Sequence, residues 1–114
     1  MTLRAISHGP STPYNSYAAV LTQAGVGAPT VNILNNDIGA LVWTRTGVGV
    51  YLATLAGAFD TSGFTFALVT FSTGAAAFAQ VTITSANVLT FNFLDAAGAA
   101  VDLGGICFIE VRLY

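Results

Sequence analysis

Residues 79–94 read AQVTITSANVLTFNFL, and their alternation of apolar and polar residues indicates the class of fold. In its first half Val81 and Ile83 alternate with threonines. In its second half every second residue from Leu89 to Phe93 is apolar, and the residues between them are a threonine and an asparagine. Alternation with a period of two places apolar side chains on one face of a β-strand and polar side chains on the other. We therefore expect a β-sheet with one apolar face.

Short strands of this kind recur along the chain, because Gly, Asn or Asp interrupts the Thr-, Val- and Phe-rich segments about every ten residues. Helix is poorly supported, since the alanine-rich segments 74–77 and 96–100 are short and contain or adjoin glycine. The sequence predicts an all-β fold, an antiparallel β-sandwich of about eight strands and of jelly-roll or Greek-key type. The expected strands are Tyr14–Gln23, Thr30–Leu34, Ala40–Arg45, Val50–Ala56, Phe64–Phe71, Ala79–Thr84, Val88–Leu94 and Ile106–Leu113.

One of these strands carries a specific expectation about the core. In FTFAL, residues 64–68, the side chains of Phe64, Phe66 and Leu68 share one face. We assign that face to the apolar core and expect Thr, Ser, Asn and Ala on the outside. Replacing Phe66 with alanine would then cost ~3–5 kcal/mol.

The first thirteen residues, Met1–Pro13, differ from the rest of the chain. Pro10 and Pro13 flank a Ser-Thr pair, and the segment has no apolar periodicity. We expect an extended N-terminal arm at 1–13, followed by a single sandwich domain at 14–114. The segment has no apolar run typical of a secretory signal. No stretch of the chain reaches the ~18 apolar residues that a spanning helix needs.

Charged residues are scarce. They make up 7% of the chain, against about 25% in a typical soluble domain. The only basic residues are Arg4, Arg45 and Arg112. This excludes the clustered basic patch with which proteins hold nucleic acid or an anionic membrane. Hydrophobic residues make up 54% of the chain, so we expect part of the outer surface to be covered by another molecule.

The residues needed for catalysis are nearly absent. The only histidine, His8, lies in the expected arm, where a base is poorly held against a nucleophile. Asp95 and Asp102 flank a loop, where Asp is favoured for backbone reasons alone. Asn35–Asp37 lacks the spaced acidic ligands of a calcium loop. We expect no enzymatic activity, no cofactor and no bound metal.

Two further positions have structural interpretations. Cys107, the only cysteine, lies between Ile106 and Phe108 and is expected to be a small buried apolar residue. Glu110 lies two residues from Arg112 on the same face of a strand, which predicts a structural ion pair or a contact at an interface.

Surface aromatic and basic residues are the candidates for contact with a partner. Trp43 has two interpretations, a core residue or an interface anchor. Tyr51 is an additional candidate for stacking on a sugar. The full set of interface candidates is Arg4, His8, Tyr14, Tyr17, Trp43, Arg45, Arg112 and Tyr114.

Under half of the chain resembles a small β-rich module of structural proteins in tailed bacteriophages and metagenomic viruses. The resemblance is carried by YAAVLTQAG at 17–25, APT at 28–30, LNN at 34–36, Gly39, VWTRTGVGVY at 42–51 and TLAGAF at 54–59. It implies a virion surface component: a capsid decoration (cement) protein, a head fibre or a fibre-tip domain. Such proteins are commonly trimeric. No functional residue is carried over.

These observations favour a homotrimeric capsid decoration protein. Its partner would be the major capsid protein or another virion protein, and it would join the virion in the host cytoplasm. The alternative is a fibre or tail tip domain that binds a host glycan through exposed aromatic residues and loop Asn and Asp side chains. A small hydrolase is the least favoured reading. We expect no nucleic-acid partner and no membrane partner.

Overall fold

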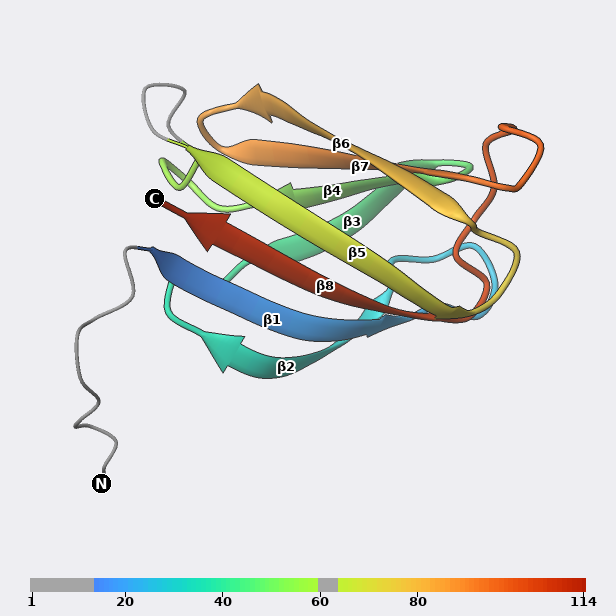
Figure 1. Ribbon diagram of the computed structural model, residues 1–114, viewed down its shortest axis with the longest axis horizontal. Helices are drawn as coiled ribbons and strands as arrows, with labels where there is room; N and C mark the ends of the chain where they lie inside the picture. The colour runs from blue at the N-terminus through green and yellow to red at the C-terminus, as the bar shows by residue number, and fades with distance from the viewer. Residues whose placement is uncertain (1–13, 60–63) are drawn as a thin grey trace.

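The computed structural model describes residues 14–59 and 64–114, and these form eight β-strands and no helix (Figure 1). The expected arm at 1–13 lies outside the described residues. The strands are β1 (Asn15–Thr22), β2 (Thr30–Asn36), β3 (Val42–Gly47), β4 (Val50–Thr54), β5 (Thr65–Thr73), β6 (Phe78–Ser85), β7 (Val88–Leu94) and β8 (Ile106–Leu113). Each expected strand is present, with ends that shift by a few residues.

The strands form two four-stranded sheets that face each other (Figure 1). One sheet has the order β2-β1-β8-β5 and the other β3-β4-β7-β6, and all neighbouring strands are antiparallel. The predicted all-β antiparallel sandwich is therefore confirmed. The jelly-roll or Greek-key type stays a prediction.

The core fills the space between the sheets, and the alternation in the sequence determines which side chains enter it. Along β7, Leu89, Phe91 and Phe93 are buried, and the residues between them face outward. On β8, Cys107 and Ile109 are buried in the same way. Burial of large side chains is the main favourable term in folding, so these faces hold the two sheets together.

The hairpin between β3 and β4 depends on one glycine. Gly49 has a φ of +71°, in the region that side chains disfavour. A Cβ atom there would lie 2.7 Å from the carbonyl oxygen of Phe93 and 2.8 Å from that of Val101. Any other residue at this position would collide with backbone that cannot move aside. The expected tight turn at Gly47-Val48-Gly49 is therefore a point where three segments meet.

The expected orientation of β5, with Phe64, Phe66 and Leu68 toward the core, is wrong. Phe66 and Leu68 point to solvent, with 50% and 41% of their surface exposed, while Ala67, Val69 and Phe71 pack against the core. Phe64 precedes the strand and is also exposed. The cause lies in the sequence of the strand, which is apolar at both odd and even positions and so does not itself select a face. Pairing with β8 selects it, because the odd positions of β5 lie opposite buried residues of β8.

Candidate functional site

The solvent side of the sheet β2-β1-β8-β5 carries a group of large apolar side chains. We call it the outer apolar face and define it by Leu34, Phe66, Leu68 and Phe108, which are between 41% and 63% exposed. The four residues come from β2, β5 and β8. Strand pairing brings the three elements into one surface, because β8 lies between β1 and β5.

A shallow groove runs across this face. Its volume is about 240 Å³, and its lining includes Ala18, Leu34, Leu68, Phe108 and Glu110. Ala18 lies opposite Glu110 across β1 and β8, and its small side chain leaves the space that the groove occupies. The groove offers apolar contact and one carboxylate. It therefore suits the side chains of another protein better than a reacting small molecule.

An aromatic and ionic cluster lies at one end of the face. Arg112 pairs with Glu110, with 3.0 Å between Nε and Oε2, and its guanidinium lies 4.8 Å from the centre of the Tyr14 ring. The rings of Tyr14 and Tyr114 are 5.0 Å apart. The hydrogen bond to Glu110 raises the pKa of Arg112, so the guanidinium stays charged. Three of the interface candidates thus meet in one place, and the predicted Glu110–Arg112 pair is confirmed.

Two other candidates lie in the core. Tyr17 is fully buried, and the indole nitrogen of Trp43 donates a hydrogen bond of 3.2 Å to its hydroxyl. The ring of Trp43 stacks against Phe91 at 5.1 Å. Burial raises the pKa of Tyr17. Tyr17 therefore has no surface with which to meet a partner, and the core interpretation of Trp43 is the one the structure supports.

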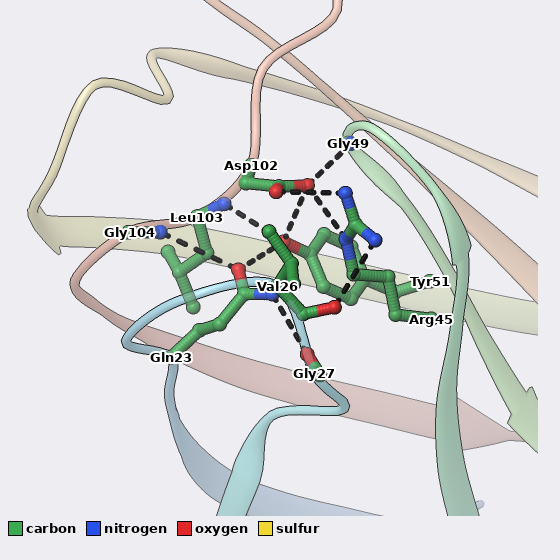
Figure 2. Close-up of polar contacts among 9 residues, drawn as sticks. All are labelled: Gln23, Val26, Gly27, Arg45, Gly49, Tyr51, Asp102, Leu103 and Gly104. Atoms are coloured by element: carbon green, nitrogen blue, oxygen red, sulfur yellow. Dashed lines mark hydrogen bonds and ion pairs between the residues drawn. The ribbon is translucent and has the colours of Figure 1, made fainter.

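Arg45 also belongs to an internal structure, the polar cluster drawn in Figure 2. Its guanidinium holds both carboxylate oxygens of Asp102, at 3.0 and 2.9 Å, and donates to the carbonyl oxygen of Val26 at 3.1 Å. The amide of Gly49 donates to the same carboxylate at 2.8 Å. Hydrogen bonding to Arg45 lowers the pKa of Asp102. The pair ties the β3–β4 hairpin to the segment that leads into β8.

Tyr51 stands at the centre of the cluster. Its hydroxyl donates to the side-chain oxygen of Gln23 and accepts the amide of Leu103 at 2.8 Å (Figure 2). The side-chain Nε2 of Gln23 donates to the carbonyl oxygen of Gly27 at 2.8 Å. Tyr51 is fully buried, and burial raises the pKa of its hydroxyl. The expectation that Tyr51 stacks on a sugar is therefore wrong.

The polar cluster holds loops together through hydrogen bonds. Its side chains bond to one another and to the backbone, and not toward a ligand. Gln23, Arg45, Tyr51 and Asp102 each have partners within the chain. The sequence does not predict this cluster, because no motif surrounds Gln23 or Tyr51. Among the buried residues that the structure describes, Gln23 is the one with an amide side chain. Its burial becomes visible only in the fold.

Arg4 and His8 lie outside the described residues. Within 14–59 and 64–114 no three His, Cys, Asp or Glu side chains are grouped so that they could hold a metal ion. The same residues include no helix with the length and apolarity to cross a membrane. Comparison with protein-family models, curated proteins and solved structures gave no match.

Proposed function

We propose that this chain is a structural component of a tailed-bacteriophage virion, a capsid decoration protein that binds the shell through its outer apolar face. The observation that carries the proposal is the exposure of Leu34, Phe66, Leu68 and Phe108 on one side of one sheet. Exposed apolar patches of this kind mark sites of protein contact. The resemblance of the sequence to phage structural modules supports the assignment to a virion.

The size of the face supports a protein partner. Four strands about 4.8 Å apart, each roughly eight residues long at ~3.3 Å per residue, cover on the order of 500 Å². Covering that area on two molecules buries about 1,000 Å², which is the lower end for a specific interface. The charges on the face, Glu110 and Arg112, neutralise each other. A partner therefore needs no opposite charge, only a complementary apolar surface.

The partner in this proposal is the major capsid protein or another virion protein, met during assembly in the host cytoplasm. The resemblance implies a trimer, but binding to the shell through the outer apolar face requires no particular number of copies. Passive stabilisation of the shell then follows from buried area, and no reaction is involved.

The test is co-sedimentation of the purified chain with undecorated capsids of the phage that encodes it. Phe108→Ser removes a central side chain of the outer apolar face and should weaken binding at least about ten-fold, because buried aromatic anchors dominate such contacts. The matched control is Leu52→Ser. Leu52 is half-buried and alternates with the buried residues Tyr51 and Ala53 on a strand of the opposite sheet. Equal binding by the two variants, or no binding by the unaltered chain, would contradict the proposal.

A second candidate function rests on one observation. The exposed ring of Tyr114, stacked on Tyr14, lies at the end of the sheet where Asn35 donates to the hydroxyl of Ser16 at 2.8 Å. Sites for small ligands combine aromatic side chains with a few placed polar groups, among them hydroxyl and amide side chains. This would suit a fibre or tail tip domain that binds a host glycan. Titration with mono- and disaccharides, followed by tyrosine fluorescence, tests it, and Tyr114→Ala should abolish any saturable change.

A further inference from the structure

Each sheet ends in two edge strands, and one of the four differs from the others. β2 contains three asparagines and pairs irregularly with β1. β3 is short and carries Arg45, and β6 carries Gln80 and an irregularity near its end. β5 is the longest at nine residues, TFALVTFST, with no charge, no proline and no asparagine. Its pairing with β8 is regular from Thr65 to Phe71 and shifts only between Phe71 and Thr73, at its end. Proteins normally protect an edge strand with such features, and an unprotected one is a template for pairing.

The free backbone groups of β5 can be identified from one hydrogen bond. The amide of Tyr114 donates to the carbonyl of Phe64 at 2.9 Å, so Phe64 directs its backbone groups toward β8. In an antiparallel ladder successive residues point their backbone groups to opposite sides. The N–H and C=O groups of Thr65, Ala67, Val69 and Phe71 therefore point away from β8. In the described part of the chain no strand pairs with this side of β5.

We infer that β5 pairs antiparallel with β5 of a second copy of this chain, about a two-fold axis that passes beside Leu68. In this register Ala67 lies opposite Val69 of the partner subunit, and Thr65 lies opposite Phe71 of the partner subunit. All four outward-directed residues then take part, which allows roughly eight hydrogen bonds. The two four-stranded sheets become one continuous sheet of twice the width.

The side chains of β5 suit pairing with an identical strand. Two copies of a charged strand would place like charges near each other, which is destabilising. β5 has no charge to repel. On the solvent side Leu68 would meet Leu68 of the partner subunit, and the two outer apolar faces would join into one surface. This extends the face and leaves it open to another protein.

An apolar groove beside β5 independently favours a neighbour at this edge. It lies between the two sheets, has a volume of about 460 Å³, and is lined by residues of β5, β6 and β7, among them Ala67, Val81 and Ile83. A second copy paired with β5 would lie across the opening of this groove. The contact would therefore bury apolar surface in addition to completing backbone hydrogen bonds.

Cysteine cross-linking tests the register. In the inferred dimer the two Leu68 residues form a non-hydrogen-bonded pair, with Cα atoms about 4.5 Å apart, within the range of a disulfide. Leu68→Cys should therefore give a covalent dimer under mild oxidation on a non-reducing gel. The matched control is Phe66→Cys, whose two copies would be separated by four residues along the strand and lie beyond disulfide reach. The native Cys107 does not compete, because burial raises the pKa of its thiol to about 12.

The outcomes are distinct. Cross-linking of Leu68→Cys but not of Phe66→Cys supports the inferred register. Equal cross-linking of both, or of neither, overturns it.

Solution mass tests the contact itself. Light scattering of the unaltered full chain should give twice the chain mass of 11.7 kDa. Ala67→Pro removes an outward amide donor and places a ring at the edge, a position where a strand tolerates proline. This variant should keep the circular dichroism of the parent and elute at the mass of one chain. A monomeric or trimeric parent would overturn the inference. Shell binding through Phe108 is a separate measurement, so it and the pairing of β5 fail independently.

Discussion

The hydroxyl of Tyr51 joins three parts of the chain through a single oxygen atom. It donates to Gln23 at the end of β1 and accepts the amide of Leu103 in the segment before β8. Both of these groups lie inside the molecule, where a lost hydrogen bond is not replaced by water. The stability of this end of the sandwich therefore depends on a group with no role at the surface.

Tyr51→Phe should lower the free energy of unfolding by about 1–3 kcal/mol, because it leaves buried donors and acceptors without a partner. Urea denaturation followed by circular dichroism measures the change. Tyr114→Phe is the matched control, since Tyr114 is half-exposed and its loss should stay within about 0.5 kcal/mol. A loss of the same size in both variants would mean that the polar cluster contributes nothing specific.

Asp102 should make stability depend on pH. Arg45 holds its pKa below the unfolded value, so the carboxylate stabilises the fold above the unfolded pKa of about 3.9. This contribution is lost as the pH falls through the lower pKa of the folded state. The free energy of unfolding should therefore decrease below about pH 4, and it should decrease less steeply in Asp102→Asn. Denaturation curves at several pH values from neutral down to pH ~2.5 check this. Parallel profiles for the two proteins would contradict it.

Single residues could be predicted from the sequence where the cause is local. The burial of Cys107 and the Glu110–Arg112 pair follow from alternation along one strand, and both were predicted correctly. The polar cluster was not predicted. Its members come from strands of one sheet and from loops at the end of the other, and Tyr51 and Asp102 are 51 residues apart in sequence. No local sequence pattern indicates contacts between residues so far apart.

The positions of the strands could be predicted from the spacing of turn residues. The inward face of a strand could be predicted where its other face is polar. β7 has a threonine and an asparagine on alternate positions, and its inward side was correctly assigned. On β6 the same pattern placed Val81 against the core, but Ile83 is 38% exposed. β5 is apolar on both sides, and its inward side depends on the register with β8. The sequence therefore predicted the strand but not the face, and the outer apolar face was missed for that reason.

A pair of substitutions on β5 tests the corrected orientation. Phe71→Ala removes a ring that lies 5.0 Å from the ring of Phe93 and should cost about 2–4 kcal/mol. Phe66→Ala removes an outward ring and should cost less than about 1 kcal/mol. Both substitutions are made in the Ala67→Pro variant, in which the inferred contact with a second copy is absent. Urea denaturation then measures the loss of stability that each one causes. A larger loss for Phe66 than for Phe71 would restore the original assignment.

At the scale of the molecule, we expect the arm at 1–13 to serve attachment and not folding. The polar, proline-containing arm has no apolar periodicity with which to join a core. Deleting residues 1–13 should leave the urea midpoint unchanged and weaken co-sedimentation with capsids. A chain that unfolds on deletion, or that binds shells as before, would contradict this expectation.

The order β2-β1-β8-β5 places the first and last strands side by side in the middle of one sheet. β1 and β5 are therefore both made long before the strand that joins them. While the chain is being translated, that sheet has a gap at its centre until Leu113 has left the ribosome. A chain cut short by a stop codon before β8 would expose the apolar sides of β1 and β5 to the proteases and chaperones of the cell. The strand order thus makes this sheet depend on β8, the last strand of the fold to be synthesised.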